Sequence, residues 1–137
     1  MHAALTVGIL AELRTLVVSA GTRRAIPTTC HIGHPGGAQS RFPHGLVDDP
    51  SLRADLVERA IDGLRETDRA CAWVSRGGEL ELNDADAEWL AASWSAFGRH
   101  GLVLPAFFVV NRNGWVDLVS GERRQWTRVR NRPRACG

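Results

Sequence analysis

Four side chains that can bind a metal or move a proton lie within fifteen positions of the chain, namely Cys30, His31, His34 and His44. Thiolate and imidazole groups suit Zn²⁺, and a bound zinc ion can order a segment that lacks its own core. We therefore predict Cys30, His34 and His44 as metal ligands, with zinc as the candidate cofactor and His31 or Cys71 completing a tetrahedron. Because adjacent residues of an extended chain point in opposite directions, at most one of Cys30 and His31 is expected to bind the ion.

The same segment offers a second chemistry, covalent catalysis by a cysteine. Cys30 would act as the nucleophile and His34 or His44 as the base, and a nearby cation such as Arg41 would favour the thiolate. The ordinary interpretation is a half-buried thiol in an edge strand. It carries more weight, since catalytic groups are recognised by geometry and not by closeness in sequence. The sequence leaves open whether the chain is an enzyme.

The segment 30–49 is interrupted by Pro35, Gly36, Gly37 and Pro43. This composition predicts a loop without regular structure, and long loops in compact domains are usually functional or disordered. We expect the loop to cover a groove, with His31 and Arg41 among the residues that contact a ligand. The predicted function is therefore binding, of a protein partner, of a second copy in a homodimer, or of a small ligand.

The C-terminal region suggests a third function, binding of single-stranded nucleic acid. Residues 112–137 contain seven arginines and two acidic residues, whereas residues 1–111 contain ten arginines and thirteen acidic residues. Trp115 and Trp126 alternate with arginines such as Arg124 and Arg128, and stacking combined with phosphate pairing holds single strands. We do not favour this alternative, because the rest of the chain is net acidic. The four residues are also candidates for an exposed ligand-binding groove.

Composition sets the broad class of the protein. The 137 residues, 44% of them hydrophobic, predict a single domain spanning 1–137 with one core. No apolar run approaches the length of about 18 residues that a membrane helix needs, so no membrane partner is expected. The three cysteines are too far apart for a disulfide framework, which predicts a cytoplasmic protein. The chain has no lysine, so lysine-dependent chemistry is excluded.

Periodicity and capping signals predict the secondary structure. Helices are expected at about 3–20, from Pro50 after the N-cap Asp49, and from Asn83 to the stop at Gly101. Glycines between apolar runs predict a hairpin at 70–82. The remaining strands are expected at 24–32 (an edge strand, because of Pro27), 102–110, 115–119 and 124–130, followed by a frayed tail at 131–137.

These elements predict an α+β fold, an antiparallel sheet of about five strands with two or three helices packed on it. The element order is helix, loop, helix, two strands, helix, three strands. Over residues 51–130 this order resembles that of the roadblock, longin and profilin-like group and, more loosely, the GAF and PAS sensor domains. The resemblance rests on element order alone. It implies a platform for dimerisation, partner binding or small-ligand sensing.

Overall fold

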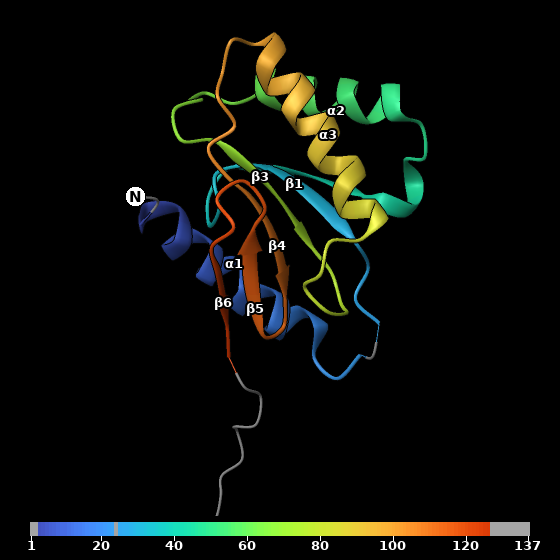
Figure 1. Cartoon of the computed structure of the whole chain (residues 1–137), viewed down its shortest axis with the longest axis vertical. Coiled ribbons are helices and arrows are strands. Elements are labelled where there is room, and N and C mark those ends of the chain that lie inside the picture. Colours follow the sequence, from blue (N-terminus) through green and yellow to red (C-terminus); the bar gives the residue numbers. More distant parts are fainter. Residues whose placement is uncertain (1–2, 24, 127–137) are drawn as a thin grey trace, which may run out of the picture.

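The computed structural model describes residues 3–23 and 25–126, which form three helices and a six-stranded sheet (Figure 1). The helices are α1 (Ala3–Ala20), α2 (Pro50–Asp62) and α3 (Asp84–Arg99), with a short 3-10 helix η1 (His44–Leu46). The strands are β1 (Thr29–Gly33), β2 (Gln39–Pro43), β3 (Cys71–Ser75), β4 (Phe107–Asn111), β5 (Gly114–Asp117) and β6 (Arg123–Gln125). The predicted α+β class is confirmed. No helix in the described ranges is both long enough and apolar enough to cross a membrane.

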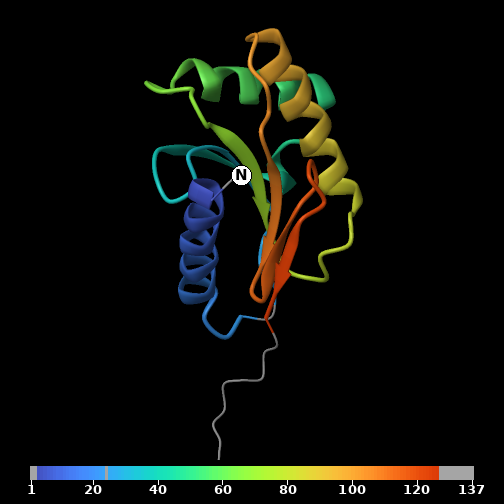
Figure 2. The same ribbon diagram turned by 60° about the vertical axis from the view of Figure 1, so that its left-hand side comes forward.

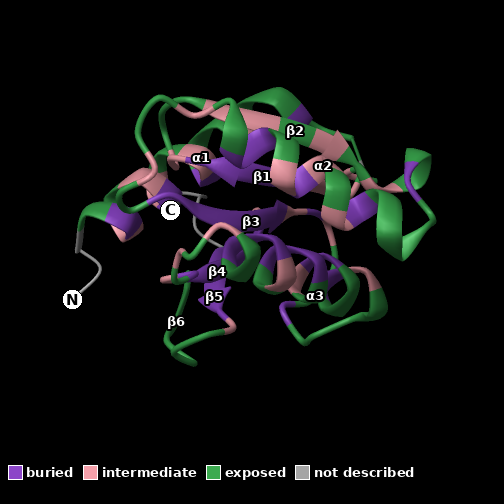
Figure 3. Ribbon diagram, turned by 90° about the horizontal axis from the view of Figure 1, so that it is seen from above, coloured by how far each residue is buried: buried purple, intermediate pink, exposed green. Residues whose placement is uncertain are grey.

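The sheet has the order β2-β1-β3-β4-β5-β6, and its neighbouring strands run antiparallel except for the parallel pair β3 and β4. Side chains alternate between the two faces of each strand. Trp73 therefore joins an apolar cluster under α1, whereas Val74 joins the cluster under α2 and α3. Figure 2 shows α1 on one side of the sheet and α3 on the other, and Figure 3 shows the buried strands between these layers.

Capping residues begin two of the helices at the predicted positions. The Asp49 side chain accepts a hydrogen bond from the Ser51 backbone N–H (2.8 Å), and Pro50 occupies the first turn, where its missing N–H costs nothing. At α3, Asn83 accepts from the Asp86 N–H (2.8 Å) and Asp86 accepts from the Asn83 N–H (3.2 Å), which completes a capping box. The predictions for both helix starts are confirmed.

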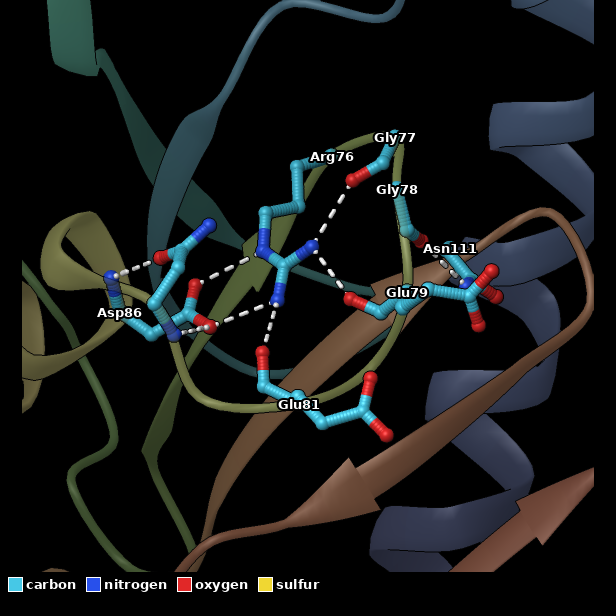
Figure 4. A network of polar contacts seen from close by, with 8 residues as sticks. Arg76, Gly77, Gly78, Glu79, Glu81, Asp86 and Asn111 are labelled. Carbon is cyan, nitrogen blue, oxygen red and sulfur yellow. Dashed lines mark hydrogen bonds and ion pairs between the residues drawn. The ribbon is translucent and has the colours of Figure 1, made fainter.

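The predicted hairpin at 70–82 is wrong, because the second strand does not form. Residues 77–82 instead wrap around the side chain of Arg76, which is 3% exposed (Figure 4). Arg76 Nη1 donates to the carbonyl oxygens of Gly77 (2.8 Å) and Glu79 (2.7 Å), and Nη2 donates to that of Glu81 (3.0 Å). These carbonyl groups are directed at a cation and cannot pair with a strand.

The Arg76 guanidinium is neutralised by a carboxylate from α3. Its Nε and Nη2 donate to Asp86 Oδ1 and Oδ2 at 2.9 and 2.7 Å, and the Asp86 side chain is fully buried. Paired donors of this kind match a carboxylate in both shape and charge. From α2 onward the element order is thus helix, strand, helix, three strands. The scaffolds that the sequence resembles have two strands between these helices, so this protein has one strand fewer there.

The segment 30–49 is not an irregular loop but mostly the hairpin of β1 and β2. His31 pairs with Arg41 and Gly33 pairs with Gln39, and β1 lies between β2 and β3, so the predicted edge position of β1 is also wrong. The proline and glycines at 35–37 form the turn, which is closed by the His34 N–H donating to the Ala38 carbonyl oxygen (2.8 Å). The proline and glycines thus indicated the turn correctly, but the two strands on either side of it were not predicted as a hairpin.

Two helical side chains have an exposure that is unusual for their residue types. Trp94 of α3 is 60% exposed, whereas Trp89 of the same helix is fully buried in the core. Arg53 of α2 is only 4% exposed, and its Nη1 donates to the Val47 carbonyl oxygen (3.1 Å). Its long side chain packs along apolar surface and brings its charged end to a polar partner.

A histidine at the end of α3 connects this helix to α2. His100 Nε2 lies 2.8 Å from Asp62 Oδ1, and its Nδ1 lies 3.0 Å from the Ala96 carbonyl oxygen. Both partners are acceptors, and only the doubly protonated ring can donate to both. The Asp62 hydrogen bond, followed by that to Ala96, therefore raises the pKa of His100 above its ordinary value of 6.5.

We expect His100 to make the stability of the fold depend on pH. A raised pKa in the folded state means that its contribution is complete below pH 6.5 and is lost as the pH rises through the folded-state value. The midpoint of urea unfolding should fall across that interval, by a small amount because Asp62 is exposed to solvent. The same titration of His100→Gln should lack this step, and a step of unchanged size would contradict the assignment.

Candidate functional site

Four polar side chains form a continuous line on the α1 side of the sheet. Ser75 Oγ lies 2.8 Å from His31 Nε2, and His31 Nδ1 lies 2.8 Å from Gln39 Oε1. Gln39 Nε2 donates to Glu12 Oε2 (2.8 Å). The line therefore connects a hydroxyl group to an imidazole ring, then to an amide and finally to a carboxylate.

The antiparallel register of β1 and β3 places the first two members together. His31 pairs with Trp73 and Thr29 pairs with Ser75, so His31 and Ser75 are diagonal neighbours on the same face. The His31 ring stacks on the Trp73 indole, with ring centroids 5.0 Å apart and planes 4° apart. Stacking and two hydrogen bonds together fix the orientation of the imidazole ring.

The hairpin turn and α1 supply the other two members. Gln39 begins β2, and its Nε2 also donates to the Gly37 carbonyl oxygen (3.1 Å). Glu12 comes from the middle of α1 and also accepts from the Gly36 N–H at 2.7 Å. Gly8, one helical turn earlier, lets α1 approach the turn so closely that an added Cβ would lie 2.3 Å from the Pro35 carbonyl oxygen. The position of Glu12 thus depends on close contact of the helix with the hairpin.

The hydrogen bonds determine the proton positions in this line. Glu12 and the Gly37 carbonyl can only accept, so the end of Gln39 that meets them is its NH₂ group and the other end is its oxygen. That oxygen requires a proton on His31 Nδ1. Burial lowers the pKa of His31 below its ordinary 6.5, despite the opposing effect of the hydrogen bond that its Nδ1 donates to Gln39, so the ring is neutral near pH 7. Its Nε2 is then an acceptor, and Ser75 donates its hydroxyl proton to it.

A cavity of about 260 Å³ opens beside this line, between the C-terminal half of α1 and strands β1, β2 and β3. Three residues of the polar line, Glu12, His31 and Ser75, also line the cavity. Its apolar wall is formed by Leu16, Ala20, Ile26 and Pro27, and two arginines, Arg23 and Arg41, complete the lining named here. The volume is slightly below the range of about 300–1,000 Å³ that holds drug-sized ligands. The cavity therefore suits a small molecule with both polar and apolar parts.

The two arginines at the cavity have different roles. Arg23 donates from Nε to the Ala20 carbonyl oxygen (3.3 Å) and from Nη2 to that of Ser19 (2.7 Å), so it caps the C-terminal end of α1. Arg41 is exposed on β2, and its side chain has no hydrogen bond or ion pair to any residue in 3–23 or 25–126. Arg41 thus has its full charge available to a ligand.

The predicted metal ligands do not come together. The Cys30 side chain lies in the core under α2 and α3, whereas His34 Nε2 is 2.7 Å from the Glu66 carbonyl oxygen at the hairpin turn. His44 Nδ1 accepts from Trp89 Nε1 at 3.1 Å. Among the residues that the structure describes, no three His, Cys, Asp or Glu side chains form a group that could hold a metal ion. The structure therefore does not bring the three predicted ligands Cys30, His34 and His44 together.

Cys30 is also unsuited to the predicted role of nucleophile. Its side chain is fully buried, and burial raises the pKa of the Cys30 thiol well above its ordinary value. The pKa of Cys71 is raised as well, first by burial and then by Asp117 and Glu12. Both thiols stay protonated and inert at neutral pH.

The residues predicted to bind a ligand lie in different parts of the structure. His31 and Arg41 line the cavity together. Trp115 is not exposed as expected but packs edge-on against Phe108 under α1, with ring centroids 5.4 Å apart. On β6 and just beyond it, Arg124 lies over the exposed Trp126 ring, 5.3 Å from its centroid. Arg128 lies outside the described residues.

Sequence inspection missed Ser75, Gln39 and Glu12. Ser75 is the one polar residue in the otherwise apolar β3, on the same face as Trp73, and this is the only local signal that marks it. Its contact with His31 spans 44 positions and depends on the pairing of β1 with β3.

No protein-family model, curated protein or solved structure matches this chain.

Proposed function

We propose that this domain binds a small amphipathic anion, such as a short-chain carboxylate, in the cavity between α1 and the β1–β2 hairpin. The observation that carries the proposal is the guanidinium of Arg41, which has no partner in the described ranges, at the edge of a cavity with a partly apolar wall. Such a cation is a ready partner for a carboxylate, which accepts two parallel hydrogen bonds from it.

The charges around the cavity support an anion over a cation. The lining contains two positive charges, on Arg23 and Arg41, and one negative charge, on Glu12. His31 adds no charge because its ring is neutral. The Glu12 Oε2 atom already accepts two hydrogen bonds from the hairpin, from the Gly36 N–H and from Gln39 Nε2. Arg23 covers carbonyl oxygens at the C-terminal end of α1, which would otherwise repel an anion.

The apolar wall supports a ligand with a hydrocarbon part. Leu16 and Ile26 are half-buried at the cavity and Ala20 is buried. Apolar surface that a ligand covers contributes about 25 cal/mol per Å² to its binding. A short acyl chain would contact these residues while its carboxylate lies near Arg41.

Titration calorimetry with hexanoate and hexylamine tests this proposal. Hexanoate should bind and hexylamine, which has the same chain with the opposite charge, should not. Arg41→Gln should weaken hexanoate binding roughly tenfold, the effect of losing about 1.4 kcal/mol from a charged hydrogen bond.

Arg59→Gln is the matched control, because Arg59 is exposed on α2, on the opposite side of the sheet. It should bind hexanoate as the unmodified protein does. Equal binding of the anion and the amine, or equal losses in the Arg41 and Arg59 variants, would show that the site is not an anion site.

A further inference from the structure

We propose that Ser75 is a nucleophile activated by His31, and that the cavity hydrolyses small carboxylic esters. This inference rests on the proposed function, because the acid that an ester would release is the kind of anion assigned to the cavity. Three contacts of 2.8 Å connect the residues of the site: Ser75 Oγ to His31 Nε2, His31 Nδ1 to Gln39 Oε1, and Gln39 Nε2 to Glu12 Oε2.

The first requirement of such a nucleophile is a base within hydrogen-bonding distance and in the correct tautomer. The network from Glu12 through Gln39 holds the proton on His31 Nδ1 and leaves Nε2 free to accept the Ser75 proton. In serine hydrolases the third residue has this same task of fixing the tautomer and the ring orientation. Here the amide of Gln39 has this task, and the Glu12 carboxylate is hydrogen-bonded to the amide and not to the histidine.

The second requirement is access for a substrate. Ser75 and His31 both line the cavity, and Ser75 is half-buried at the end of β3. Arg41 pairs with His31 across β1 and β2 and lines the same cavity. Its positive charge would stabilise the negative oxygen that develops on the substrate carbonyl.

The steps balance without an oxidant or a metal. Ser75 Oγ attacks the carbonyl carbon of the ester while its proton moves to His31 Nε2, and the alcohol leaves as its C–O bond breaks and it takes that proton. Water then attacks the acyl-Ser75, giving a proton to His31. The carboxylic acid is released as the bond to Oγ breaks and His31 returns the proton to Ser75. One ester and one water give one acid and one alcohol.

The neutral amide sets the expected rate. In the usual triad a carboxylate next to the histidine stabilises the imidazolium that forms during attack. Gln39 provides only a dipole, and the Glu12 charge acts from behind it, so we expect slow turnover of esters such as 4-nitrophenyl butyrate. A reagent that traps the nucleophile once is therefore a more sensitive probe than turnover.

A fluorophosphonate probe tests the proposal directly, because Ser75 Oγ would displace fluoride from phosphorus and remain covalently bound. Trypsin cleaves after Arg69 and Arg76 and releases residues 70–76, which contain Ser75 as their single serine. Mass spectrometry should find the probe on this peptide at Ser75. Ser75→Ala should reduce labelling to background, and His31→Gln should slow it by about 100- to 10,000-fold, the usual contribution of a general base.

Ser40→Ala is the matched control, because Ser40 lies on β2 between Gln39 and Arg41 but pairs with Ile32 of the opposite core. It should be labelled at the normal rate. Gln39→Met tests the positioning role of the amide: it should lower kcat for 4-nitrophenyl butyrate and leave KM nearly unchanged, which a general loss of structure would not do. Equal losses of fluorophosphonate labelling in the Ser40→Ala and Ser75→Ala variants would overturn the proposal.

Hexanoate separates this inference from the proposed function. Labelling of Ser75 that hexanoate blocks would support both. If hexanoate binds with the dependence on Arg41 described above and the unmodified protein is not labelled at Ser75, the nucleophile proposal is overturned and the binding site remains. If hexanoate does not bind and Ser75 is not labelled, both proposals are overturned.

Discussion

Replacing Asp86 with alanine should lower the free energy of unfolding by about 3–5 kcal/mol, the typical cost of leaving one half of a buried ion pair without its partner. Asp86 is fully buried and binds Arg76 through both oxygens. Without it, the guanidinium would stay buried with its charge uncompensated, and the 77–82 loop that wraps around it would lose its anchor (Figure 4). The first turn of α3 would also lose a capping-box contact.

Asp84→Ala provides the control for this change, because Asp84 lies in the same first turn of α3 but is exposed. Its carboxylate interacts favourably with the helix dipole, an effect of about 0.3–1 kcal/mol. Urea unfolding followed by circular dichroism measures both variants. Similar losses in the two would mean that the Asp86 effect comes from helix electrostatics and not from the buried pair with Arg76.

Gly8→Ala should also destabilise the fold, by about 1–2 kcal/mol, although alanine is the better helix former. The new Cβ would lie 2.3 Å from the Pro35 carbonyl oxygen, a backbone atom that cannot rotate away. Overpacking of this kind costs about 1–3 kcal/mol, which exceeds the gain of up to about 1 kcal/mol in helix propensity. Since Glu12 lies one turn further along α1, moving the helix should also loosen its contact with Gln39 and slow labelling of Ser75.

The matching substitution in α3 should have the opposite sign. A Cβ added to Gly98 meets nothing within 4 Å, so Gly98→Ala should raise the free energy of unfolding by about 0.5–1 kcal/mol through helix propensity alone. Thermal unfolding of the two variants gives the comparison. A stabilised Gly8→Ala protein would show that α1 can shift away from the hairpin turn without cost.

The features that could be predicted from the sequence are those encoded by neighbouring residues. The α1 helix has its predicted range, and Asp49 and Asn83 cap α2 and α3 as their residue types indicate. The strands expected at 102–110 and 115–119 also form, in part, as the paired strands β4 and β5. Capping and turn formation are local, so no knowledge of the tertiary fold is needed to recognise them.

The features that could not be predicted depend on tertiary contacts. Glu79 and Glu81 alternate with leucines like a strand, but their carbonyl groups bind Arg76, whose own position depends on Asp86 in α3. The candidate site is hidden for the same reason. Ser75 and His31 become neighbours only through the pairing of β1 with β3, and Glu12 joins them only when α1 packs on the hairpin.

The order of the strands has a consequence for how this protein behaves in concentrated solution. In the described part of the chain, β2 and β6 are the outermost strands, and an outermost strand offers unpaired backbone groups that can recruit another molecule into a growing aggregate. Both rims are poor templates for such growth. β6 presents Arg123 and Arg124, and β2 presents Arg41 and ends at Pro43, which has no N–H to donate. Repulsion between guanidinium groups at the rims should therefore oppose edge-to-edge polymerisation.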